Sequence, residues 1–265
     1  MSEPAPVPEL APAPVVYEQP LNERMRAFLR LEFLWKQATY HAASANALSS
    51  RASVSSLLEI LAITARGDSR GEVFKELERQ MASLRDYQSR QGVDTNLLRN
   101  ILATLVRRRE ALNAMGSNFL QKLRDSEFLN AIKHRSAIPG GTCEFDLPDY
   151  THWLNQDAAA RMADLESWLG TIRPLCECIG ELLWVTRQNA RTKREVATGG
   201  VFQIAFERDQ PIQMLRITVP GGSGLYPEVS GSHHRCSLRF LMWTDVQSRP
   251  VQAQGDVPFL LTCCT

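Results

Sequence analysis

The sequence predicts an α+β fold in which an N-terminal all-helical domain is followed by a smaller domain of antiparallel β-strands. Apolar residues recur every three to four positions from Asn22 to about Asn189, which is the period of an amphipathic helix. From Thr192 the period shortens to two, and clusters of glycine and proline separate the apolar runs. The expected parts are a Pro/Ala-rich tail over residues 1–14, a helical domain over 15–190 and a β-strand domain over 191–265.

The composition is that of a globular protein and favours no strongly charged partner. Of the 265 residues, 44% are hydrophobic and 22% are charged, and the net charge is +1, so no overall field would attract nucleic acid or a membrane surface. The tail lacks the basic start and the apolar segment of a signal peptide, and we expect it to be disordered. No apolar run reaches the roughly 18 residues of a membrane span. We therefore expect a cytoplasmic protein without membrane insertion.

The first helix should begin abruptly, after a short extended segment over Val15–Glu18. Pro20 has no backbone N–H to donate, and Asn22 is a good N-cap, so the helix is expected from Asn22 to about Ala45. At about 100° per residue, one broad apolar stripe should comprise Met25, Phe28, Leu29 and Phe33.

Two arginines lie at the edge of this stripe. Arg26 and Arg30 are one turn apart and should point toward one place, which favours an anion or a carboxylate between them. Glu32 falls inside the stripe, so we expect it to bond a buried arginine or a backbone donor. The alternative is a solvated helix edge with one internal ion pair.

Further helices are expected along the first 190 residues, with a sharp turn at Pro139-Gly140-Gly141. Their expected ranges are Ser50 to Gly67, a third helix ending before Gly92, Asp94 onward, Ser126–Arg135, Leu154–Leu169 and Arg173–Asn189. An antiparallel meander should follow, with strands over Val201–Phe206, Met214–Val219, Arg235–Trp243 and Pro258–Cys264.

The strand over Arg235–Trp243 carries a candidate binding surface. Because side chains alternate along a strand, Arg235, Ser237 and Arg239 share one face. Cys236, Leu238 and Phe240 take the other face. Two arginines about 13 Å apart would make a surface that receives anions, which His234 and Arg216 would extend. The alternative is an ordinary solvent-exposed face.

No motif indicates an enzyme, a cofactor or a metal. Cys143 and His152 could be nucleophile and base, but no motif provides an orienting carboxylate. The sequence contains no phosphate-binding glycine loop, HExxH or GxSxG. His233, His234 and Cys236 with Cys263 and Cys264 match no standard zinc spacing.

A nucleic-acid-binding protein is the alternative function. It would use the basic face of the β domain, with Phe240, Trp243 and Tyr226 as stacking platforms. The low net charge and the absence of a known motif count against it.

From about Tyr17 to Cys264 the chain resembles the ZapD family. The resemblance is carried by Glu18-Gln19-Pro20-Leu21-Asn22-Glu23, Met25-Arg26, Leu29-Arg30, Glu32-Phe33-Leu34, Ile138-Pro139-Gly140-Gly141, Cys143, Phe145-Asp146-Leu147-Pro148, Trp153-Leu154, Leu225-Tyr226-Pro227, Val229-Ser230-Gly231, Arg235, Arg239-Phe240 and Cys263-Cys264. The tail before Val15 and the link from Thr192 to Gly200 lie outside these matches.

The resemblance implies a cytoplasmic, non-enzymatic regulator of bacterial division that acts at mid-cell. Such proteins form homodimers, bind the partly acidic C-terminal tail of FtsZ and cross-link its filaments into bundles that stabilise the Z-ring. They receive the tail on a basic surface between a helical and a β-strand domain. The matching positions in this chain are Arg26, Arg30, Arg235 and Arg239, followed by Lys133, His152 and His234. Glu127 stands where other members carry basic residues.

Overall fold

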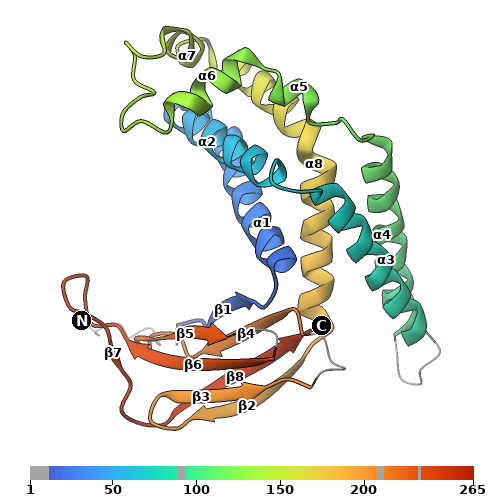
Figure 1. Cartoon of the computed structure of the whole chain (residues 1–265), viewed down its shortest axis with the longest axis vertical. Helices are drawn as coiled ribbons and strands as arrows, with labels where there is room; N and C mark the ends of the chain where they lie inside the picture. The colour runs from blue at the N-terminus through green and yellow to red at the C-terminus, as the bar shows by residue number, and fades with distance from the viewer. Residues whose placement is uncertain (1–11, 89–93, 208–211, 232–233) are drawn as a thin grey trace, which may run out of the picture. The chain divides into compact units, whose positions relative to one another are not determined.

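The computed structural model describes residues 12–88, 94–207, 212–231 and 234–265, and Figure 1 labels its helices and strands. The chain divides into two compact units. The helical unit comprises Ala27–Trp184, and the sheet unit comprises Met1–Arg26 with Val185–Thr265. Helices dominate the first unit and antiparallel strands the second, which confirms the predicted α+β class. Within the described ranges, no helix combines the length and apolar character needed to cross a bilayer.

The helices mostly begin where the sequence places an N-cap residue. The Oδ1 atom of Asn22 accepts a hydrogen bond of 2.8 Å from the backbone N–H of Met25, and Asp94 and Ser126 cap later helices in the same way. The helices are α1 Glu23–Ala42, α2 Ala47–Thr64, α3 Ser69–Tyr87, α4 Thr95–Ala114, α5 Gln121–Arg124, α6 Glu127–Arg135, α7 Pro148–Leu154 and α8 Ala158–Gln188. The short helices α5 and α7 were not expected.

The buried stripe of α1 differs from the predicted one. The buried positions are Met25, Phe28, Leu31, Leu34 and Ala38. They follow one another by three, three, three and four residues. The mean step is shorter than the 3.6 residues of a helical turn, so the buried side rotates around the helix. Phe33 is therefore 64% exposed, and its assignment to the stripe was wrong. Glu32 is partly buried and pairs with Lys36 at 3.3 Å.

One continuous helix, α8, replaces the two helices predicted over Leu154–Leu169 and Arg173–Asn189. Pro174 lies inside it, where the missing N–H removes the hydrogen bond to the carbonyl of Gly170. Buried residues on both sides of the proline, such as Leu169 and Leu175, keep both halves packed in the core. Their burial offsets the local cost of the proline.

Helices α3 and α4 run side by side as an antiparallel hairpin (Figure 1). Leu77 and Met81 of α3 and Leu105 of α4 are fully buried. Arg109 of α4 donates to Glu78 of α3 at 2.9 Å, and Arg108 pairs with Glu177 of α8.

The described strands form two four-stranded antiparallel sheets. The strands are β1 Val15–Pro20, β2 Arg191–Ala197, β3 Val201–Ala205, β4 Met214–Val219, β5 Leu225–Gly231, β6 Arg235–Met242, β7 Val251–Gln252 and β8 Val257–Cys264. One sheet has the order β1-β4-β8-β2; the other has the order β3-β6-β5, with β7 also paired to β6. Antiparallel pairing was predicted correctly. The meander was wrong, because β4 pairs with β1 and β8 rather than with its neighbours in sequence.

The two sheets pack face to face around an aromatic core. Phe259 of β8 lies 4.9 Å from Phe240 of β6 and 5.3 Å from Phe202 of β3, measured between ring centroids. Leu238 and Ile217 are fully buried in the same cluster. The inward side of β6 is therefore fixed in the core, and its other side carries the exposed Arg235 and Arg239.

Three of the described strands, β2, β5 and β7, were not predicted, and β1 was predicted only as a short extended segment. β1 pairs with β4 in full register, and Val15–Pro20 belongs to the sheet unit. β2 is mostly exposed and so lacks the alternation of a half-buried strand. β5 contains Pro227, which a strand tolerates at the edge of a sheet, and β5 is an edge strand in its sheet order.

Candidate functional site

The outward face of β6 is the clearest of the predicted binding surfaces. Arg235 and Arg239 are exposed, whereas Cys236, Leu238 and Phe240 between and beside them are buried, so the predicted alternation is confirmed. Across the sheet the neighbours of these arginines on β3 are Val201 and Ala205. Figure 1 shows β6 between β3 and β5, so both arginines stand on the central strand of this sheet.

The two arginines differ in their partners. Arg239 lies opposite Glu228 of β5 in the strand register, and its Nη2 atom donates to Glu228 Oε2 at 2.5 Å. Both side chains of this pair remain about half exposed, at 54% and 52%. Arg235 has no ion pair or side-chain hydrogen bond within the described ranges. Glu228 was not identified from the sequence, because only the strand register brings it to Arg239.

His234 immediately precedes β6 and is exposed. Its backbone carbonyl accepts a hydrogen bond of 2.9 Å from the N–H of Phe206, which continues the pairing of β3 with β6. His234 thus lies beside Arg235 at one end of the strand. His233, part of the formal metal cluster, lies outside the described residues.

Arg216 was expected to extend the β6 surface, and this was wrong. It lies on β4 in the other sheet, where its Nε atom donates to Glu18 of β1 at 3.0 Å. Arg187, near the end of α8, donates to both oxygens of the same carboxylate at 2.8 Å. We call Glu18, Arg187 and Arg216 the Glu18 cluster. All three side chains are mostly buried, so the cluster stabilises the sheet unit instead of offering a free cation.

Arg26 and Arg30 lie on successive turns of α1. The Nη1 atom of Arg26 donates to Glu23 at 2.7 Å, and Glu23 is 84% exposed, so this is a solvated pair on the helix edge. Arg30 is exposed, and the described part of the chain provides no ion pair or hydrogen bond to its side chain. A carboxylate therefore lies beside one of the two arginines, and it comes from the same helix.

Lys133 and His152 lie on two helices that an aromatic cluster joins. Phe128 of α6 contacts Tyr150 and Trp153 of α7, in both cases edge to face with centroids 5.9 Å apart. Lys133 in the last turn of α6 and His152 on α7 are both exposed. Lysine near a helix C-terminus also complements the helix dipole.

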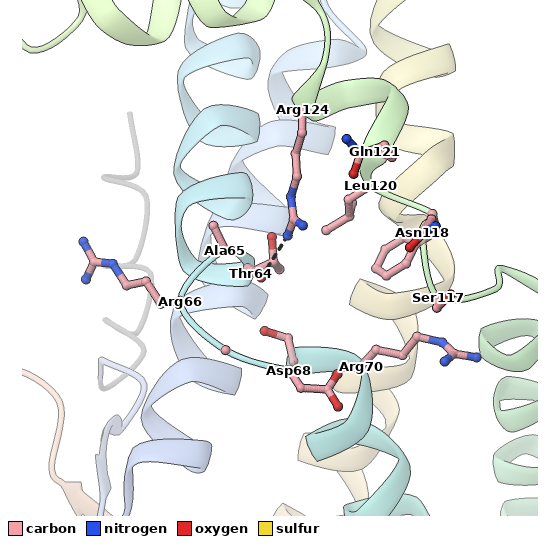
Figure 2. Close-up of a pocket in the computed structure, with 13 residues that line it drawn as sticks. Thr64, Ala65, Arg66, Asp68, Arg70, Ser117, Asn118, Leu120, Gln121 and Arg124 are labelled. Atoms are coloured by element: carbon pink, nitrogen blue, oxygen red, sulfur yellow. Dashed lines mark hydrogen bonds between the residues drawn. The ribbon is translucent and has the colours of Figure 1, made fainter.

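The helical unit contains a pocket of about 460 Å³ between the α2–α3 turn and residues 117–124 (Figure 2). Arg124 points into it and donates to the carbonyl of Thr64 at 3.0 Å. Arg66 and Arg70 point away from it, and Arg70 donates to the carbonyl of Leu112 at 3.3 Å. Arg70 and Arg124 thus satisfy carbonyls at helix ends. None of the predicted site residues lines this pocket.

Among the residues that the structure describes, the cysteines and histidines form no arrangement that suggests chemistry. The Sγ atom of Cys143 lies 3.6 Å from Oδ2 of Asp146. Within the described ranges, Cys143 makes no hydrogen bond to His152. Burial raises the pKa of the Cys176 and Cys178 thiols to about 12 and that of Cys264 to about 11, so these thiols are protonated at neutral pH. Within the described residues, no group of three or more potential ligands could hold a metal.

The nucleic-acid alternative loses one of its three stacking platforms. Phe240 is fully buried against Phe259 and cannot stack on a base. Trp243 is half exposed and Tyr226 partly buried.

Comparison with known proteins assigns the chain to a family. The family model for ZapD, described as a cell division protein, matches residues 29–239. A cell division protein ZapD from Methylococcus capsulatus is 38% identical over 250 residues, which cover 94% of this chain and 98% of that protein. Those from Azoarcus sp. and Dechloromonas aromatica are 33% and 36% identical over 251 and 253 residues, covering 95% and 94% of this chain and 99% of each relative. The chain therefore belongs to the ZapD family of cell division proteins.

Proposed function

We propose that this protein binds the C-terminal tail of FtsZ and, as a homodimer, cross-links FtsZ filaments into bundles that promote Z-ring assembly and stability. It acts in the cytoplasm at mid-cell and catalyses no reaction. Membership of the ZapD family supports the role in cell division. The proposal that it binds the FtsZ tail is supported by exposed arginines that an acidic peptide could reach.

The observation that carries the proposal is the exposed arginine face of β6. Arg235 is free to bind a carboxylate, and Arg239 is half exposed and bonded to an acid that is itself half exposed. A solvated pair of this kind contributes roughly 0–1 kcal/mol, so a carboxylate of a bound peptide can replace or share Glu228 at small cost. Arginine is suited to this role because its planar group binds carboxylates through two parallel hydrogen bonds.

The helix α1 contributes the second pair of proposed contacts. Arg30 is exposed, and the exposed pair of Arg26 with Glu23 is as easily exchanged as that of Arg239. Lys133, His152 and His234 are exposed and are assigned a secondary role in attracting the tail.

Weak single contacts are sufficient for bundling. Each filament displays many identical tails, and a dimer carries two receptive sites, so the second contact forms at a high effective concentration. Contacts between arginine and carboxylate at an exposed surface are screened by salt. Bundling should therefore weaken steeply as the ionic strength rises.

The test is sedimentation of FtsZ with GTP, using full-length FtsZ and FtsZ without its C-terminal tail. We expect co-pelleting and bundling that depend on the tail. Arg239→Glu and Arg30→Glu should each abolish co-pelleting while circular dichroism and the dimer mass remain unchanged. The matched control is Arg194→Glu, the same charge reversal at an exposed arginine of β2 in the other sheet.

Undiminished pelleting of both Arg239→Glu and Arg30→Glu would refute the site. Co-pelleting with tail-less FtsZ would place the contact elsewhere on FtsZ. A shift of labelled single-stranded RNA at moderate salt, without FtsZ pelleting, would instead favour the nucleic-acid alternative.

A further inference from the structure

The sheet unit contains a second pocket, of about 530 Å³, whose lining is mainly apolar. We call it the aromatic pocket. Its walls come from β1, from the turn between β4 and β5, and from the end of β6. Its aromatic side chains are Tyr17, Tyr226 and Trp243. None of the seven residues proposed to bind FtsZ lines it, so its role is independent of the proposed function.

The lining is complementary to a proline-rich strand. Prolines have no N–H and leave a chain rich in carbonyl acceptors, so a site for them needs flat apolar surfaces and hydrogen-bond donors. Tyr17, Tyr226 and Trp243 supply both, because each has an apolar ring and a polar hydrogen. Within the described ranges no protein acceptor is assigned to the hydroxyls of Tyr17 and Tyr226 or to the indole N–H of Trp243. Trp243 is half exposed, and its backbone N–H donates to Gly224 at 2.7 Å, which holds it at the pocket.

The chain's own N-terminal segment starts at the wall of this pocket. Pro12 and Ala13 pass so close to the β4–β5 turn that only glycine fits there. A Cβ atom on Gly221 would lie 2.2 Å from the carbonyl oxygen of Ala13, and one on Gly222 would lie 2.8 Å from Cγ of Pro12. Gly222 also lines the pocket.

The preceding residues have the composition that such a pocket recognises. Prolines occupy every second position at Pro4, Pro6 and Pro8, a spacing that favours the polyproline II conformation. At about 3 Å per residue, the four residue steps from Pro8 to Pro12 span roughly 12 Å, enough to bring the proline run back over the pocket from its wall.

We propose that the aromatic pocket is the docking site for the chain's own proline-rich segment, residues 2–10, with the prolines stacked on Trp243 and Tyr226. Docking within one chain benefits from a high effective concentration, so even a weak peptide site would be occupied.

The experiment uses the full-length chain labelled with 5-fluorotryptophan and observed by ¹⁹F NMR. Trp243→Phe assigns the Trp243 resonance, and Trp184, which is exposed in the helical unit, serves as an internal reference. A triple variant, Pro4→Gly with Pro6→Gly and Pro8→Gly, keeps the chain length. We expect its Trp243 resonance to shift from the wild-type position while the Trp184 resonance stays.

Adding a synthetic peptide of residues 2–12 at millimolar concentration to the triple variant should then return the Trp243 resonance toward the wild-type position in a saturable way. The same peptide with glycine at positions 4, 6 and 8 should not. Identical Trp243 resonances in the two full-length chains would overturn the proposal. It would also be overturned by a shift that the peptide cannot reverse, or by equal binding of the peptide to both chains, which would mark the pocket as open to a partner's peptide.

Discussion

Glu228 should compete with the acidic tail for Arg239, and this competition can be measured. Glu228 on β5 and Arg239 on β6 lie opposite each other, with 2.5 Å between Glu228 Oε2 and Arg239 Nη2, and each side chain is about half exposed. Glu228→Gln keeps the shape and one acceptor oxygen but removes the competing charge. We therefore predict that this substitution strengthens binding of the FtsZ tail.

The size of the effect follows from the exposure of the pair. A solvent-exposed ion pair contributes about 0.2–1 kcal/mol, and the peptide no longer has to displace it in the variant. The affinity should rise by about 1.4- to 5-fold, and the free energy of unfolding should fall by at most about 1 kcal/mol. Arg239→Gln should weaken binding instead, because it leaves Glu228 facing the acidic peptide.

The assay is fluorescence anisotropy of a labelled FtsZ tail peptide at two salt concentrations. The matched control is Glu195→Gln on β2 in the other sheet, which changes the net charge by the same amount. A general charge effect would strengthen both variants equally. Equal gains in the two variants, or unchanged or weaker binding in Glu228→Gln, would refute the contact between Arg239 and an acidic group of the tail.

Three further predictions concern stability. Glu18→Gln removes the negative charge that pairs with the two guanidiniums of the Glu18 cluster, and it should lower the free energy of unfolding, measured in urea, by about 2–3 kcal/mol. Glu23→Gln, the same change at an exposed pair, should lower it by less than about 0.5 kcal/mol. Equal losses would contradict the stabilising role of the cluster. Burial raises the pKa of Tyr150 from 10.0 to about 12, so the stabilisation from this group is fully present below pH 10 and is lost as the pH rises through 12. Tyr150→Phe should reduce this loss by up to about 2–3 kcal/mol in unfolding curves measured between pH 9 and 12. An unchanged dependence of the unfolding free energy on pH would contradict this prediction. Gly199→Ala should lower the free energy of unfolding by about 1–2 kcal/mol because of its positive φ of 55°. Gly200→Ala should lower it more, because its Cβ would also lie 2.4 Å from the carbonyl oxygen of Ala253. A smaller drop in melting temperature for Gly200→Ala than for Gly199→Ala would contradict this clash.

Features that depend on neighbouring residues in the chain were predictable from the sequence. The caps at Asn22, Asp94 and Ser126 each bond a backbone N–H two or three residues later, so the helix starts could be predicted from local sequence. The same holds for β6, where the alternation from Arg235 to Phe240 placed Arg235 and Arg239 on one face.

Features that depend on packing were not predictable in this way. The continuity of α8 through Pro174 reflects burial on both sides of the proline, and the exposure of Phe33 reflects a buried stripe that rotates around α1. In both cases the tertiary contacts outweigh a local preference.

For the candidate site, the sequence by itself determined which cations stand on one strand face and on successive turns of one helix, because side-chain direction along an element follows from its period. Only the tertiary structure decided which of these cations already have a partner. Strand register joins Glu228 to Arg239, 11 residues further along the chain, and Glu18 to Arg216, 198 residues further along. Both pairings depend on the order of strands in the sheets. Register is set by the burial of whole faces and by the turns between strands, so no short stretch of sequence contains it.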